Sequence, residues 1–228
     1  MKPQLLRFGT SQSPVVVVDD FSGSVEDVAR LADALAPFPP IAGNYYPGVR
    51  RVIREADADA YAYVFETCRQ AAPFIGGAFA VDGFDLVEGS FSLVTLQPHE
   101  LQPVQRTPHF DSPEPTLFAV LHYLRVPPGS GTAFFRHLGT GIERVTDTNV
   151  DRFVNAARAD AAKLPRDSGY MHGSDRFYEQ IGAVEAIPDR LVIYHSSLLH
   201  SGIIPPGMTF SPDPAHGRLT ANIFVRGR

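Results

Sequence analysis

The residues of this chain whose types and spacing could do chemistry begin with His109 and Asp111, two positions apart. In an extended strand, residues i and i+2 project from the same face, so this imidazole and this carboxylate can reach one metal ion. A second imidazole from a distant strand would complete a three-ligand face and leave the other metal positions open. The chain offers two candidates for that imidazole, His195 and His200. The spacing therefore predicts a metal site made by His109, Asp111 and one of these two histidines.

A His-x-Asp pair is weak evidence by itself, because it arises by chance in many chains. The segments around the pair strengthen the prediction. His109 and Asp111 lie just before a strand-like run at 117–126, and both histidine candidates follow another run at 190–194. Arg218 begins a third run, at 219–225. Three strand ends would then bring two imidazoles, a carboxylate and an arginine to one place.

The elements that must position these residues are mostly short strands. Twenty prolines and nineteen glycines are spread along the chain, which is typical of a β-rich fold with many turns. Apolar spacing and helix-start residues predict helices at 25–35, 57–72 and 148–164, and a shorter one at 175–181. The other runs predict strands at 15–18, on each side of Glu88-Gly89, and at 117–126, 132–137, 183–187, 190–194 and 219–225.

This order predicts a mainly β fold with flanking helices, in which two helices pack on one side of an eight-stranded jelly roll (a double-stranded β-helix, cupin-like). We expect one domain over residues 1–228. Residues 1–78 would provide helical support and a possible substrate loop, and 79–228 the jelly-roll core with a helical insertion around 148–164.

Composition excludes several classes of function. The formal net charge of −5 argues against a sequence-independent nucleic-acid binder. No stretch approaches the ~20 apolar residues of a membrane span. Cys68 is the only cysteine, which excludes an intrachain disulfide and a thiolate zinc site. The first residues lack a signal-peptide core, so we expect a cytoplasmic protein without nucleic-acid or membrane partners, as a monomer or homodimer.

The order of these residues resembles the Fe(II)- and 2-oxoglutarate-dependent dioxygenases, especially the prolyl-4-hydroxylase-like branch, over residues 79–226. The segment Leu199-His200-Ser201-Gly202 is similar to the family's distal-ligand segment, which favours His200 over His195. The resemblance implies Fe(II), 2-oxoglutarate and O2 as cofactor and co-substrates. Related halogenases lack the carboxylate ligand, so Asp111 favours hydroxylation or a similar C–H oxidation.

The resemblance also implies a site for the second carboxylate of 2-oxoglutarate. The planar fork of an arginine suits a carboxylate, and Arg218 stands where the family has a basic residue at the start of the last strand. Thr220 and Asn222 share its face by alternation, and Tyr123 is the further expected contact. The interval from His200 to Arg218 is longer than is usual in the family, which indicates a loop insertion at 205–214.

Substrate recognition is the least determined part of the prediction. Aromatic, basic and imidazole side chains near the expected site are the candidates: Tyr45, Tyr46, Arg50, Arg136, His137 and His172. A small molecule or peptide would fit, so the main hypothesis is hydroxylation of a C–H bond of an amino acid, a peptide or a natural product. The alternatives are a non-haem iron enzyme that does not use 2-oxoglutarate and a non-catalytic jelly-roll binding protein.

Overall fold

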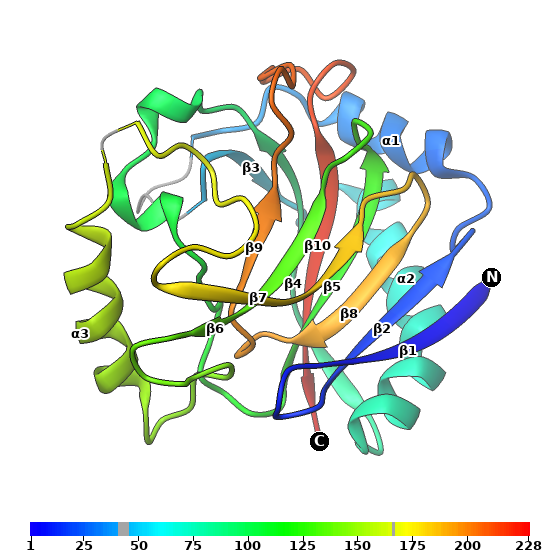
Figure 1. The fold of residues 1–228 in the computed structure, drawn as a ribbon. Coiled ribbons are helices and arrows are strands. Elements are labelled where there is room, and N and C mark those ends of the chain that lie inside the picture. Colours follow the sequence, from blue (N-terminus) through cyan, green and yellow to red (C-terminus); the bar gives the residue numbers. More distant parts are fainter. Residues whose placement is uncertain (41–45, 166) are drawn as a thin grey trace.

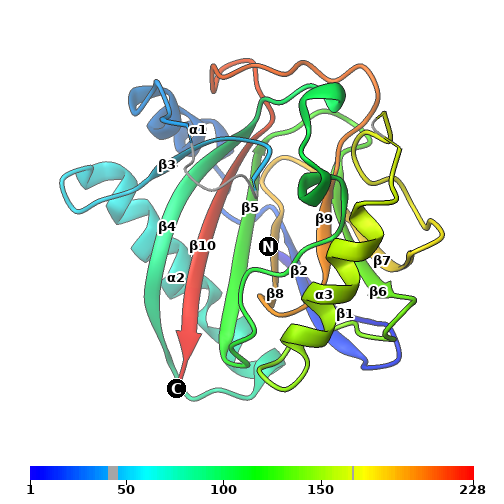
Figure 2. The same cartoon turned by 90° about the vertical axis from the view of Figure 1, so that its left-hand side faces the viewer.

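The computed structural model describes residues 1–40, 46–165 and 167–228, and its strands form two antiparallel sheets that face each other (Figures 1 and 2). The larger sheet has seven strands in the order β1-β2-β8-β5-β10-β4-β3. Their bounds are Lys2–Phe8 (β1), Ser13–Asp19 (β2), Leu191–His195 (β8), Leu117–Arg125 (β5), Leu219–Gly227 (β10), Phe84–Val94 (β4) and Gly48–Val52 (β3). Strand β10 is therefore interior to the sheet and pairs with β5 and β4.

The smaller sheet has three strands in the order β7-β6-β9. They span Tyr178–Glu185 (β7), Gly131–His137 (β6) and His200–Ile203 (β9). One apolar cluster between the sheets joins Tyr123 and Val192 of the larger sheet to Phe134 and Val184 of the smaller one. This two-sheet arrangement confirms the predicted mainly β jelly-roll class.

Two helices cover the outer face of the larger sheet, and a third lies beside the smaller sheet (Figure 2). Helices α1 (Val25–Ala34) and α2 (Ala58–Phe79) lie on the larger sheet, where Val64 and Ile75 share a core with Phe118 and Ile193. Helix α3 (Val150–Ala161) lies by the smaller sheet, where Phe153 packs in a core with Phe135. Apolar side chains fill the face of the larger sheet that packs on α1 and α2, whereas the face between the sheets also carries polar residues, such as Thr220 and Asn222 of β10.

Two short 3-10 helices, Pro98–Glu100 and Pro103–Arg106, precede the His-x-Asp segment. None of the helices in the described ranges combines the length and the apolarity that a membrane span requires.

Several predicted elements were wrong in type or extent. The two strands expected around Glu88-Gly89 are one strand, β4, and the glycine serves close packing: a Cβ at Gly89 would lie 2.8 Å from a Val64 methyl group. The helix expected at 57–72 continues past Pro73 to Phe79. The helix expected at 175–181 is instead the approach to β7 and its first residues, because these pair with β6.

Three strands were not predicted at all: β1, β3 and β9. Strand β3 lies within residues 1–78, for which helices and a substrate loop are expected, and its register with β4 places Arg50 opposite Ser92. Strand β9 has only four residues, too few for alternation to be visible in the sequence.

Candidate metal centre

The metal centre is built on main-chain pairing between His109 and His200. The two residues form an isolated antiparallel bridge, so they lie opposite one another at the start of β9. Asp111 is placed by its own amide, which donates a hydrogen bond of 2.8 Å to the carbonyl of Ser196. Main-chain bonds alone therefore bring the three side chains to one spot.

The three ligand atoms of His109, Asp111 and His200 all lie within 4.8 Å of one another. The Asp111 carboxylate oxygens lie 3.9 Å from Nε2 of His109 and 3.7 Å from Nε2 of His200, too far for hydrogen bonds. Nδ1 of His200 donates to the carbonyl of Leu198 at 2.8 Å, which leaves the lone pair on Nε2 facing the carboxylate. Two imidazole nitrogens and one carboxylate on one side of an ion are the donor set of non-haem iron(II). The residues present thus fit the predicted metal.

Burial keeps both imidazoles neutral at neutral pH, as metal ligands must be. It lowers the pKa of His200 to about 4, although the hydrogen bond to the Leu198 carbonyl acts to raise this pKa. Burial and the adjacent His200 also lower the pKa of His109, whose side chain is the more open of the two, with 43% exposed. Burial raises the pKa of Asp111, against the charges of His109 and Arg50.

The alternative ligand, His195, lies on the other face of β8. Its ring is in contact distance of Phe79 and Phe118, on the side that α2 covers. Its neighbour Tyr194 points between the sheets and packs on the ring of His200, with ring centroids 4.9 Å apart. Alternation along β8 therefore separates the two candidates, and the structure brings His200 to Asp111.

A cavity of about 130 Å³ begins at the metal centre and extends between the sheets. Thr220, Asn222 and Phe224 line it from alternate positions of β10, and Arg218, the residue just before the strand, continues the same row. Because β10 runs through the middle of the larger sheet, this single strand supplies a row of side chains from one end of the cavity to the other.

Arg218 makes one end of the cavity strongly positive. It is 6% exposed, donates through Nη2 to the carbonyl of Gly131 at 3.2 Å, and forms no salt bridge with a described residue. Three buried polar atoms around the cavity have no hydrogen-bond partner: Nε of Arg218, the hydroxyl of Tyr46 and the hydroxyl of Ser92. A buried cation and unsatisfied hydroxyl donors together call for an anionic acceptor, because leaving them unpaired costs free energy.

Of the other residues predicted to bind the co-substrate, two line the cavity and one does not. Thr220 and Asn222 line the cavity, and the Asn222 amide donates to the Thr220 hydroxyl at 3.2 Å. Tyr123 is fully buried and is not part of the cavity wall. Its ring lies 5.8 Å from the Arg218 guanidinium carbon, and its hydroxyl is 2.7 Å from that of Thr132, which does line the cavity.

Of the residues predicted for substrate recognition, Tyr46 and Arg50 line the cavity. Tyr45 lies outside the described residues. The other three do not reach the cavity: Arg136, His137 and His172.

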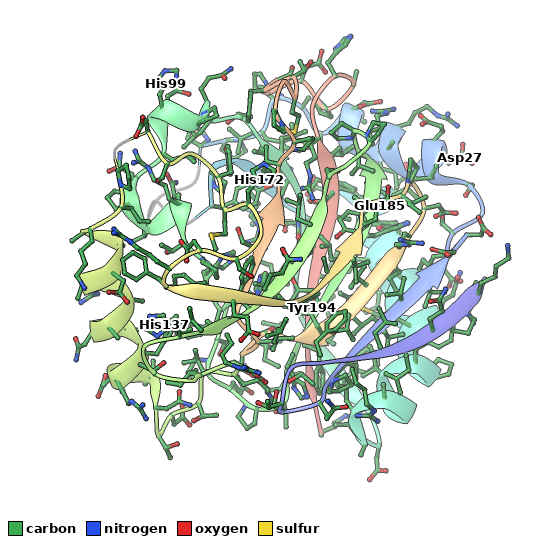
Figure 3. The ribbon with its side chains drawn as sticks, in the orientation of Figure 1. Asp27, His99, His137, His172, Glu185 and Tyr194 are labelled. Atoms are coloured by element: carbon green, nitrogen blue, oxygen red, sulfur yellow. The ribbon has the colours of Figure 1, made fainter. Side chains whose placement is uncertain are left out.

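Each of these three is held elsewhere for a physical reason. Arg136 pairs with Glu143 at 2.6 Å and with Glu179 at 2.9 Å, at the end of β6 where the β1–β2 turn closes. His137 points to the opposite face of β6 and lies beside α3, with Nε2 3.1 Å from Asp160 (Figure 3). His172 is exposed on the connection before β7.

Several residues that line the cavity were not predicted from the sequence, among them Tyr194, Ser92, Thr132 and Tyr170. Tyr194 lies in the interior in Figure 3. Neighbouring residues of a strand point to opposite faces. If His195 is not the metal ligand and faces away from the site, then its neighbour Tyr194 must face the site, so the sequence pattern could have predicted Tyr194. Tyr170 lies two residues before the candidate His172, but no pattern in the sequence distinguishes it from its neighbours.

Several solved structures have a similar fold. The non-heme alpha ketoglutarate-dependent epimerase SnoN, from nogalamycin biosynthesis, has a TM-score of 0.54 at 14% identity over 95% of this chain and 79% of that one. A prolyl-4-hydroxylase of Pseudomonas putida has a TM-score of 0.52 at 15% identity over 96% and 95%. HygX of Streptomyces hygroscopicus, with nickel and 2-oxoglutarate bound, has a TM-score of 0.53 at 13% identity over 95% and 84%. The predicted fold relationship is confirmed.

No curated protein matches the sequence. The model of one protein family matches residues 1–225, and its description is a family of unknown function, DUF6445.

Proposed function

Because the chain belongs to DUF6445, a family of unknown function, we propose its activity from its site: an Fe(II)- and 2-oxoglutarate-dependent oxygenase that hydroxylates a C–H bond of an amino acid, a peptide or a natural product. The observation that carries the proposal is the presence of two complementary sites in one cavity. His109, Asp111 and His200 form a metal-ligand face, and Arg218 lies farther along as a buried cation without a carboxylate partner in the described chain.

The proposed reaction balances as substrate R–H, O2 and 2-oxoglutarate giving R–OH, succinate and CO2. One oxygen atom enters succinate and the other enters the new hydroxyl group. When bound, iron(II) supplies the oxidising chemistry that couples decarboxylation of the keto acid to C–H oxidation. His109, Asp111 and His200 would hold the ion, and as three ligands they would leave it able to bind the keto acid and dioxygen as well.

The protein residues bind and orient the keto acid. Arg218 pairs with its distal carboxylate, and the hydroxyls of Tyr46, Ser92 and Thr220 supply further hydrogen-bond donors at the same end. Tyr123 supports this group from behind, because it packs on Arg218 and fixes Thr132. Apolar walls from Ala119, Leu121 and Ile204 limit water around the reacting atoms.

A titration of Ni(II)-loaded protein with 2-oxoglutarate tests the proposal, together with succinate formation by the Fe(II)-loaded protein in air. The proposal requires metal-dependent binding of 2-oxoglutarate and release of succinate. A protein that binds metal but shows neither would be the alternative non-haem enzyme without 2-oxoglutarate. A protein that binds no divalent ion would be the non-catalytic binding protein.

A further inference from the structure

Arg50 lines the same cavity as Arg218, and its guanidinium lies beside Phe224, toward the other end of the row of β10 side chains. The register of β4 with β10 pairs Ser92 with Thr220, near Arg218, and pairs Glu88 with Phe224, farther along. Arg50 leaves β3 opposite Ser92, yet its guanidinium lies 5.6 Å above the ring of Phe224. Its side chain therefore runs along the cavity away from Arg218.

The Arg50 guanidinium is held in place by two contacts, but not all of its hydrogen-bond donors have a partner in the described ranges. Nε donates to the hydroxyl of Ser90 at 2.7 Å, and Nη2 lies 3.0 Å from a carboxylate oxygen of Glu88. Within the described ranges, Nη1 has no hydrogen-bond partner. The side chain of Arg50 is 25% exposed and that of Glu88 is 38% exposed, so this ion pair is worth little and can admit a further acceptor.

Arg50 is also close to the reacting end of the site. It lines the same cavity as Asp111 and His109. Of the described residues that line the cavity, Arg50 and Arg218 are the two arginines, and there is no lysine. Because Arg218 is assigned to the keto acid, Arg50 is the cation of the described cavity lining that remains for a second anion.

We propose, resting on the function proposed above, that Arg50 binds a carboxylate of the substrate, so that the substrate is an organic acid whose oxidised C–H bond lies close to its carboxylate. The planar guanidinium suits a carboxylate, and Ser90 together with Phe224 hold it in one orientation. Glu88 competes with the substrate for the same cation. Removal of Glu88 and removal of Arg50 must therefore have opposite effects.

Calorimetric titration of the protein loaded with Ni(II) and 2-oxoglutarate tests this inference. The probes are the N-acetyl amino acids and, in parallel, the corresponding carboxamides, which differ only in the charge of the carboxyl group. In the wild-type protein at least one acid should bind about tenfold more tightly than its amide. Arg50→Gln should abolish this preference, and Glu88→Gln should strengthen binding of the acid.

Arg51→Gln is the matched control on the same strand. Arg51 pairs with Asp57 at 2.7 Å and is not part of the cavity wall, so its removal should leave the preference intact. The inference is refuted if no acid binds better than its amide, or if the preference survives Arg50→Gln. Wild-type protein that binds metal but not 2-oxoglutarate would instead refute the proposed function, before any probe is added.

Discussion

His109 and His200 exchange both of their main-chain hydrogen bonds, with N···O distances of 2.9 and 2.8 Å. Residues that are paired in this way in an antiparallel ladder project their side chains to the same face, and the two ring centroids lie 4.4 Å apart. The two imidazoles are therefore held together by the backbone, without help from a bound ion.

The first prediction concerns the choice between two histidines. We expect His200→Ala to weaken Ni(II) or Fe(II) binding by more than about a hundredfold, because loss of groups that merely orient a ligand already costs about 10- to 100-fold. His195→Ala should leave metal affinity unchanged, since its ring faces Phe79 and Phe118. Calorimetric titration with Ni(II) measures both. Equal losses in the two variants would contradict the assigned metal centre.

The second prediction concerns the cation at the far end of the cavity. Arg218→Gln should raise the dissociation constant of 2-oxoglutarate by about tenfold to a thousandfold, because a buried charge pair is lost. Metal affinity should not change. Arg226→Gln, near the end of the strand that follows Arg218, is the control: the Arg226 side chain is 53% exposed and pairs with Glu114, outside the cavity. An unchanged affinity for 2-oxoglutarate in Arg218→Gln would remove this residue from the keto-acid site.

The third prediction separates the carboxylate ligand from the keto-acid site. Asp111→Gly should abolish oxidation of the substrate while 2-oxoglutarate still binds to the metal-loaded protein, since Arg218 and the cavity donors are untouched. Succinate release and calorimetric binding of 2-oxoglutarate measure the two properties separately. Succinate release at the wild-type rate would show that Asp111 is not needed for the reaction.

The fourth prediction concerns stability against acid. Burial acts to raise the pKa of Glu143, but hydrogen bonds from Ser11, Thr10 and Arg136 outweigh it and lower the pKa to about 2. The carboxylate form therefore stabilises the fold at neutral pH, and this contribution is lost as pH falls from about 4.5 towards 2. Glu143→Gln should lower the free energy of unfolding by about 2–3 kcal/mol at pH 7.

Urea unfolding at pH 7 and at pH 3 measures this effect, and the difference between variant and wild type should be smaller at pH 3. Glu179→Gln is the control, because Glu179 pairs with the same Arg136 but is 47% exposed. Its cost should stay below about 1 kcal/mol. A Glu143→Gln penalty that does not shrink in acid would assign the effect to packing instead of charge.

The central strands, and the row of residues on one face of β10, could be predicted from the sequence. The runs at 117–126 and 219–225 are long and apolar, so alternation places Thr220 and Asn222 beside Arg218 without any structure. The choice of His200 came from the resemblance, because spacing alone could not exclude His195. The main-chain bridge between His109 and His200 shows why: it depends on a long-range register that no local pattern records.

The peripheral residues could not be placed from sequence. His137 and Arg136 end a strand that does border the cavity, but alternation turns His137 to α3, and Glu143 holds Arg136 at the sheet end. Strand β3 could not be predicted because its surroundings are rich in glycine, proline and tyrosine. Its pairing with β4 brings Arg50 to the cavity. In each case a contact with a distant part of the chain determined the outcome.

The position of β10 between β5 and β4 has a consequence for how such chains can diverge. Residues added or lost in the connection from 204 to 217 change the length of an external loop but leave the strand's register intact. Deletion of one residue within β10 would instead exchange its two faces, so that Ala221 and Ile223 would point between the sheets while Thr220 and Asn222 would be pressed against the helices. Natural relatives should therefore vary freely in that loop and keep the number of residues in the strand fixed.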